Sequence, residues 1–213
     1  MFHLDGTWVA SASDLVTAMT CEYQLLARRA EKAGLVAKLD VAEDALQARA
    51  AVLGDQHEAA TLAELVAAHG TGAPGGVVTI DRPSTKSRES LVAAHEQTRD
   101  ALLAGAQVVF QAAFFDGTFH GMADFVVRVD DGSAPGPRYE VADTKLARSA
   151  RAKALLQLAT YANQIEAMGF PAPERVHLWL GDGAKPSFRS ADLEPVLVER
   201  WGRLRELLDS PAT

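Results

Sequence analysis

The sequence predicts a mixed α/β fold, in which helices pack against a sheet whose strands run in both directions. Helical and strand patterns alternate regularly from residue 87 onward, in the order helix, three strands, helix, strand, helix. An Asp-Gly pair at 116–117 marks a hairpin between the first two strands. Antiparallel strands between helices favour a mixed sheet, and the strand after the second helix is expected to return parallel by a crossover.

The first 86 residues are expected to be mostly helical. "SASDLVTAMTCEYQLLARRAEKAGL" opens on a cap-like Ser-Ala-Ser-Asp and continues with helix formers. The Gly- and Pro-rich "HGTGAPGGVVTIDRPST" then gives the best internal boundary. We therefore divide the chain into an N-terminal helical segment, 1–86, and a core, 87–213. The elements expected before the core are helices over 13–33 and about 40–69, the latter broken near Gly54, and a loop or short hairpin over 70–86.

Stop signals set the limits of the core helices. Gly105 follows the first of them, and Gly169 closes the second with Pro171 just beyond. A longer loop, "DDGSAPGP", separates the second and third strands. The expected core elements are helices over 87–105, 148–169 and 191–209, three strands within 106–147 and a strand over 174–183.

Composition is that of an ordinary globular chain, with 48% hydrophobic and 23% charged residues. No run approaches the roughly 20 apolar residues that a membrane span needs, and the start of the chain lacks a signal-peptide pattern. We therefore expect no membrane partner and a cytoplasmic location. The single cysteine, Cys21, cannot form an internal disulfide, which fits a reducing compartment.

The charge distribution is uneven. The net charge of −7 argues, as an average, against binding to nucleic acid. Between residues 145 and 165, however, the chain carries no acidic residue and four basic ones, Lys145, Arg148, Arg151 and Lys153. Taken alone, this cluster is better explained as the solvated start of a helix.

Charged side chains occupy inner positions of two predicted strands. Asp124 lies in "GMADFVVRV", whereas Asp143 and Lys145 lie in "YEVADTK" and project to the same face. If the two strands are neighbours, Asp124 and Asp143 approach each other, and two buried carboxylates repel without a cation. Mg²⁺ or Mn²⁺ would remove that conflict. Alone, however, Asp143 and Lys145 are better explained as a surface ion pair worth less than about 1 kcal/mol.

Gln157 and Tyr161 lie four residues apart in the predicted helix that follows, and therefore share one of its faces. A glutamine in the apolar stretch "ALLQLATYANQIEAMG" needs a polar partner. Two explanations are open. The pair is either a satisfied core glutamine with a half-buried tyrosine, or it faces a cleft and contacts the Asp143 strand or a nucleic-acid strand.

Three short motifs together resemble the PD-(D/E)XK nuclease superfamily. The resemblance is greatest to its RecB-like branch, which includes CRISPR-adaptation exonucleases and nuclease domains fused to helicases. That branch combines a Gly-x-x-Asp strand, an acidic-x-Lys strand and a Gln-x-x-x-Tyr helix. The motifs occur here in that order as Gly121 and Asp124, Asp143 and Lys145, and Gln157 and Tyr161. The helix, three strands, helix and strand of 87–183 also resemble its restriction-endonuclease-like core, so the resemblance covers most of the chain.

The resemblance implies a divalent-metal-dependent deoxyribonuclease, exonuclease-like on single-stranded ends, that acts in DNA repair or recombination. The implied catalytic residues are Asp124, Asp143, Lys145, Gln157 and Tyr161. The implied holders of Mg²⁺ or Mn²⁺ are His57, Asp124, Asp143 and the backbone carbonyl of Thr144. The implied contacts to DNA are Arg148, Arg151 and Lys153.

His57 enters this set only through the resemblance, because the branch has a metal-binding histidine on an upstream helix. "LGDQHEAATLAEL" supplies His57 in a similar context. By itself, His57 is better explained as a surface histidine next to Glu58.

The branch's opening helix often carries a cysteine that is one of four ligands of an iron–sulfur cluster, and Cys21 stands at that point. The other three cysteines usually follow the last helix, and none is present here. One thiolate cannot hold a cluster, so we expect none within these residues. Cys21 is a candidate ligand only in a longer protein, and here it is expected to be buried and inert.

Two further interpretations remain open. The chain is either a DNA-binding or docking module of a helicase–nuclease assembly that does not cut, or an interaction domain in which all motif residues are structural. A specific Mn²⁺ site would count against the first, and salt-dependent DNA binding would count against the second.

Overall fold

The computed structural model describes residues 1–38, 44–129, 136–147 and 149–210. The strands are β1 (Phe2–Leu4), β2 (Thr7–Val9), β3 (Val77–Thr79), β4 (Val108–Phe115), β5 (His120–Arg128), β6 (Tyr139–Lys145), β7 (Arg175–Leu180) and β8 (Ser187–Arg189). The helices are α1 (Ala12–Thr20), α2 (Glu22–Lys32), α3 (Ala45–His69), α4 (Arg88–Leu103), α5 (Ala152–Ala167) and α6 (Ser190–Asp209).

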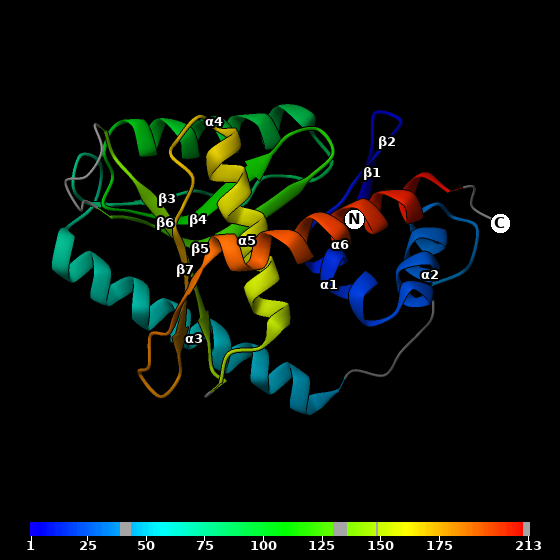
Figure 1. Cartoon of the computed structure of the whole chain (residues 1–213), viewed down its shortest axis with the longest axis horizontal. Helices are drawn as coiled ribbons and strands as arrows, with labels where there is room; N and C mark the ends of the chain where they lie inside the picture. Colours follow the sequence, from blue (N-terminus) through cyan, green and yellow to red (C-terminus); the bar gives the residue numbers. More distant parts are fainter. Residues whose placement is uncertain (39–43, 130–135, 148, 211–213) are drawn as a thin grey trace.

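The centre of the molecule is a six-stranded sheet in the order β3-β4-β5-β6-β7-β8 (Figure 1). Strands β4, β5 and β6 form consecutive antiparallel pairs, whereas β3 is parallel to β4 and β7 is parallel to β6. The mixed α/β class is therefore confirmed, and so is the parallel return of the strand after α5. The three strands predicted within 106–147 are β4, β5 and β6.

Helices cover the sheet on both faces. On one face, apolar residues of α4 and α5 pack with Val109, Val126 and Val141 into the main core. On the other face, α3 contributes partly buried residues such as Leu62 to a cluster around Phe125. Figure 1 shows α5 and α6 on the near side of the sheet and α3 on the far side. The side chains of β5 and β6 are thus enclosed from two directions.

Four short strands were not predicted, because three residues are too few to show an alternating pattern. They are β1 and β2, which form a separate hairpin, and β3 and β8, which extend the sheet at its two ends. The stretch 70–86, expected as a loop or hairpin, contains β3 and so gives the sheet a strand from the first 86 residues. The expected break near Gly54 is absent from α3, while 39–43 lie outside the described residues.

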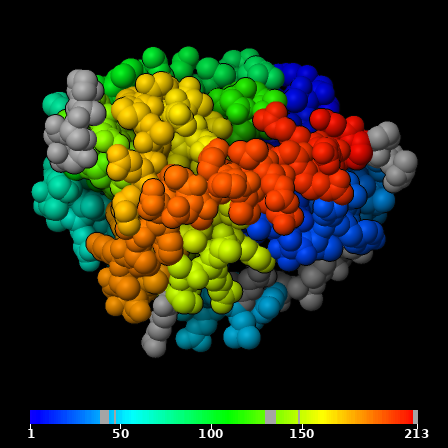
Figure 2. Space-filling view, in the orientation of Figure 1, coloured from blue at the N-terminus to red at the C-terminus, as the bar shows by residue number. Residues whose placement is uncertain are grey.

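The first and last helices lie together at one end of the molecule. Leu15 and Leu25 of α1 and α2 pack with Leu197 and Leu204 of α6 into a second apolar cluster. In Figure 2, the blue N-terminal helices and the red C-terminal helix lie side by side. This contact attaches the N-terminal helices to α6, which in turn packs against α5.

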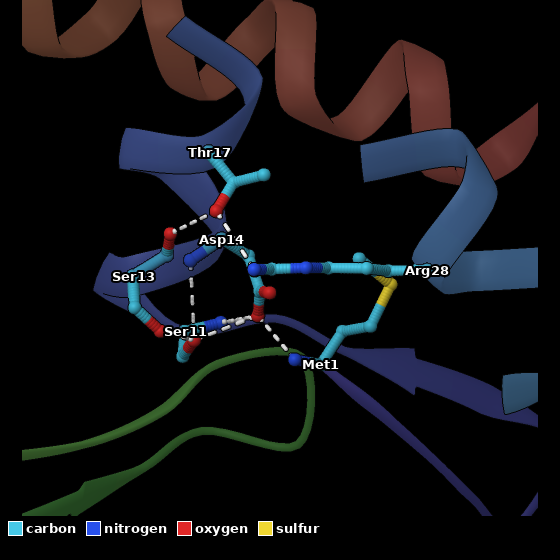
Figure 3. A network of polar contacts seen from close by, with 6 residues as sticks. All are labelled: Met1, Ser11, Ser13, Asp14, Thr17 and Arg28. Carbon is cyan, nitrogen blue, oxygen red and sulfur yellow. Dashed lines mark hydrogen bonds and ion pairs between the residues drawn. The ribbon is translucent and has the colours of Figure 1, made fainter. Parts of the chain in front are cut away.

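A polar network fixes the start of α1 (Figure 3). The Asp14 carboxylate accepts hydrogen bonds from the Ser11 amide (2.9 Å) and hydroxyl (2.6 Å), and it contacts the amino group of Met1. The Ser11 hydroxyl also accepts from the Asp14 amide, which completes a capping box. Ser11 and Ser13 also line the cavity described below, so this cap places the start of α1 at its rim.

Cys21 divides the helix expected over 13–33 into α1 and α2. Its backbone is extended, with φ at −161°, and its amide donates to the Thr17 carbonyl at 2.9 Å to close α1. The expectation that Cys21 is buried is wrong, because the side chain is exposed. A residue at the junction of two helices lies outside the helical pattern from which burial is predicted. Among the helices that the structure describes, none is long and apolar enough to cross a membrane.

Candidate functional site

The two strand carboxylates lie together in the middle of the sheet. The antiparallel register pairs Phe125 with Ala142, and one further step along both strands brings Asp124 opposite Asp143. Burial raises the pKa of Asp143, and the two carboxyl groups are close enough that Asp124 raises it further. The backbone amide and hydroxyl of Thr144 also approach Asp124 Oδ2, at 3.2 and 3.4 Å. Asp124 thus accepts contacts from two consecutive residues of β6.

Lys145 lies beside Asp143, as the spacing of two residues along a strand predicts. Its Nζ lies 2.8 Å from Asp143 Oδ1 and 2.6 Å from Oδ2. The Asp143 side chain is 12% exposed and that of Lys145 is 41% exposed. The pair therefore extends from the interior toward solvent, with the ammonium group at the outer end.

Burial and the neighbouring Asp124 raise the pKa of Asp143 to about 8, although Lys145 acts in the opposite direction. One ammonium group does not neutralise two carboxylates at such close range. Without a further cation, the pair therefore retains a proton near neutral pH.

Tyr161 of α5 packs directly against β5. Its ring is stacked on Phe114 with centroids 5.7 Å apart, and its hydroxyl lies near the backbone of Met122. Burial, and then the charges of Asp124 and Asp143, raise the pKa of the Tyr161 phenol. The hydroxyl therefore stays protonated and available as a donor.

A cavity of about 410 Å³ opens next to these groups. Asp124, Gln157 and Tyr161 all line it, so the Gly-x-x-Asp strand and the Gln-x-x-x-Tyr helix meet there, whereas Asp143 and Lys145 are not among its lining residues. Gln157 therefore faces a cavity. This agrees with the second explanation of the sequence analysis, a cleft-facing glutamine, rather than with a glutamine inside the core. Whether it binds a nucleic-acid strand there stays a prediction.

Glu58 and Gln111 also line this cavity, and the sequence did not single them out. Gln111 Nε2 donates to Glu58 Oε1 at 2.5 Å. Burial, followed by the Asp124 and Asp55 charges, raises the pKa of Glu58, while the hydrogen bond from Gln111 lowers it. Asp55, Glu58 and Asp124 outnumber Arg82, which also lines the cavity, so the cavity is acidic on balance.

The backbone at Gln111 explains how this contact arises. Its φ of 54° lies in the left-handed region, which non-glycine residues rarely adopt. On either side, Phe110 pairs with Phe125 and Ala112 pairs with Ala123. Gln111 therefore lies across from Asp124 at an irregular point of the sheet. Strained backbone of this kind concentrates at functional sites. The only sequence signal for it is a polar residue inside the apolar run "VVFQAAFF".

His57 is not among the residues that line the cavity. It precedes Glu58 on α3, so its side chain is turned by about 100° around the helix axis. Its Nε2 is buried and has no hydrogen-bond partner among the described residues. In the described part of the chain, no three His, Cys, Asp or Glu side chains are close enough together to hold a metal ion. The metal-binding roles of His57 and Thr144 stay predictions.

Of the three predicted DNA contacts, Arg148 lies outside the described residues. Arg151 and Lys153 are exposed at the start of α5 and line a smaller hollow next to the cavity, together with Lys145 and Gln157. The structure thus places these two cations beside the site.

No family model matches the sequence, and no curated protein sequence matches it. Among solved structures, the chain is similar to one described as the crystal structure of SSO0001. The TM-score is 0.44 and the sequence identity is 15%, over 99% of this chain and 82% of that one. This similarity is too distant to assign a function.

Proposed function

We propose that the chain is a RecB-like nuclease domain that hydrolyses DNA phosphodiester bonds with the help of a divalent metal ion. The observation that carries this proposal is the contact between Asp124 and Asp143, with Lys145 bound to the second carboxylate. Helix α4, strands β4 to β6, helix α5 and strand β7 would then form a restriction-endonuclease-like core. The expected substrate is a single-stranded DNA end in repair or recombination, with a helicase as a possible fused or associated partner.

The carboxylate pair fits a divalent cation in charge and in donor type. Without a metal ion, Asp143 and Asp124 reduce their mutual repulsion by keeping one proton between them. A divalent cation that replaced this proton would neutralise both carboxylates. Carboxylate oxygens are the donors that Mg²⁺ and Mn²⁺ prefer. When bound, such an ion polarises a phosphoryl oxygen and lowers the pKa of a water molecule. Asp124 and Asp143 are the residues that would hold it.

The remaining residues have roles that follow from their positions. Lys145, at the solvent end of the ion pair, would orient the attacking water and offset the charge that develops on the phosphate. The Tyr161 hydroxyl stays protonated and supports the carboxylates from α5. Gln157, one turn before Tyr161, would contact the strand that is cut.

The direct test is cleavage of labelled single-stranded DNA with Mg²⁺, with Mn²⁺ and with a chelator. We expect cleavage only with metal, and we expect Asp143→Ala and Lys145→Ala each to lose at least about 10²-fold in rate. Circular dichroism spectra would show whether both variants fold. Equal cleavage by all three proteins would contradict the proposal. Wild-type protein that binds DNA without cutting it, and shows no Mn²⁺ site by calorimetry, would instead indicate a docking module.

A second experiment asks which α3 residue acts at the site. The structure favours Glu58 over His57, because Glu58 lines the cavity and interacts with Asp124. We expect Glu58→Gln to weaken Mn²⁺ binding about 10- to 100-fold, a size typical for groups that support metal ligands. Glu64→Gln, an exposed change on the same helix, is the matched control. Weakened binding in His57→Ala, with none in Glu58→Gln, would show that His57 is the ligand instead.

A further inference from the structure

A second hollow, of about 190 Å³, lies beside the acidic cavity. Its lining includes the cationic side chains of Lys145, Arg151 and Lys153, and it includes no acidic residue among those described. Lys145 is already paired with Asp143. Arg151 and Lys153 form no ion pair with any described residue, so their charges are available to a ligand.

Gln157 lines both the acidic cavity and the cationic hollow, which makes the two hollows neighbours across one side chain. Lys153, Gln157 and Tyr161 follow one another at four-residue intervals on α5 and therefore lie along one face of that helix. Along this face, Lys153 lies at the cationic hollow, Gln157 lies between the two hollows, and Tyr161 lies beside the carboxylates. The site thus has a defined direction in which a ligand can extend.

The two hollows differ in the ligand that each can accept. The larger cavity, whose three carboxylates outnumber its Arg82, disfavours a phosphate unless a metal ion intervenes. The smaller hollow attracts a phosphate directly, through Arg151 and Lys153. Its lining also includes the half-buried Ala147, against which the carbon face of a sugar can pack, whereas Ala154 and Leu178 beside it are buried. Its chemistry is therefore that of a site for a nucleotide rather than for a small inorganic anion.

We propose that this hollow binds the phosphate and sugar of the nucleotide that adjoins the scissile one in a single-stranded nucleic acid. Arg151 and Lys153 contact the phosphate, and Gln157 separates this nucleotide from the one that is cut. The inference rests on the proposed nuclease function and adds to it a binding subsite on one side of the scissile bond. Binding at this subsite requires no metal ion.

The test measures binding without cleavage. A fluorescein-labelled oligothymidylate is titrated in the presence of a chelator, and anisotropy is followed between about 50 and 200 mM salt. We expect Arg151→Gln/Lys153→Gln to bind at least about 10-fold more weakly at the lowest salt. We also expect the slope of log affinity against log salt to become shallower by about 0.7, because the subsite holds one phosphate and each lost single-strand phosphate contact removes about 0.7.

Lys32→Gln/Arg99→Gln is the matched control, because it removes the same charge from exposed positions on α2 and α4. The control should bind as the wild-type protein does. A control that loses as much affinity as Arg151→Gln/Lys153→Gln would show that net charge acts rather than a subsite. Inorganic phosphate that competes as well as a dinucleotide, at equal concentration, would indicate a simple anion site and contradict the role of the sugar.

The outcome separates the two proposals. If the wild-type protein cuts DNA while Arg151→Gln/Lys153→Gln keeps wild-type affinity and salt slope, the subsite is wrong and the nuclease function stands. If the wild-type protein neither binds nor cuts DNA, both are wrong. In cleavage assays, the subsite predicts a rise in KM of at least about 10-fold with kcat nearly unchanged, because Arg151 and Lys153 bind beside the reacting bond rather than at it.

Discussion

Replacing Asp143 with asparagine is expected to make the protein more stable toward unfolding when no divalent metal is present. The side chain is almost buried, beside a second carboxylate, and Lys145 compensates for only one of the two charges. Asparagine keeps the shape and can still hydrogen-bond to Asp124, but it carries no charge. At about pH 8 we expect a gain of a few kcal/mol, which corresponds to roughly 5–10 °C in Tm.

The gain should depend on pH in a definite direction. The pKa of Asp143 is about 8 in the folded protein, above its ordinary value of 3.8. Between these two values the folded state holds a proton that the unfolded state has lost, so the contribution of Asp143 to stability falls as the pH rises. Below about pH 4 both states are protonated, and the difference between wild-type protein and Asp143→Asn should vanish. It should grow from there and level off above about pH 8.

Thermal unfolding of the two proteins across this range, with and without Mn²⁺, checks the prediction. Mn²⁺ binds the ionised carboxylates, so it should stabilise the wild-type protein more at about pH 8 than at about pH 5. It should leave Asp143→Asn almost unchanged. A wild-type protein that is more stable than Asp143→Asn at pH 8 without metal would contradict our account of the carboxylate pair.

The part of the site that lies on neighbouring strands could be predicted from the sequence. Asp143 and Lys145 project to one side because strand side chains alternate, and Asp124 meets them because its strand is the next one in the sheet. These relations depend only on local geometry and on the order of the elements. The same reasoning found the helices and the longer strands, whose periodicity extends over many residues.

The remainder depends on long-range contacts that local patterns do not contain. Which side chain of α3 faces the cavity that Asp124 lines depends on how that helix is rotated about its axis. A rotation by one residue, about 100°, would turn His57 toward the cavity in place of Glu58. Gln111 hydrogen-bonds to Glu58 from a backbone in the left-handed conformation, and no glycine or turn sequence predicts that conformation there. Strands of three residues, such as β3, form because a neighbour offers them hydrogen bonds rather than because of their own composition.

Gly121 should be as sensitive to change as the charged residues, although it carries no chemistry. A Cβ atom there would lie 2.6 Å from Cε1 of Tyr161 and 2.8 Å from Cζ of Phe119. Neither ring can move easily, because Phe119 is 2% exposed and Tyr161 is stacked on Phe114. Gly121→Ala is therefore expected to lower the free energy of unfolding by about 1–3 kcal/mol, the usual cost of overpacking.

Gly202→Ala is the matched control for this change. Gly202 lies inside α6, where an added Cβ atom meets nothing within 4 Å. Alanine there should stabilise the protein by about 0.5–1 kcal/mol, because it restricts the unfolded chain and favours the helix. Urea unfolding would thus show that the same substitution, glycine to alanine, lowers the free energy of unfolding at position 121 and raises it at position 202. If Gly121→Ala were also neutral or stabilising, α5 would not be packed against β5 closely enough for Tyr161 to support the carboxylates. Loss of DNA cleavage in Gly121→Ala, beyond what its unfolded fraction explains, would instead show that the position of the Tyr161 ring matters for the reaction.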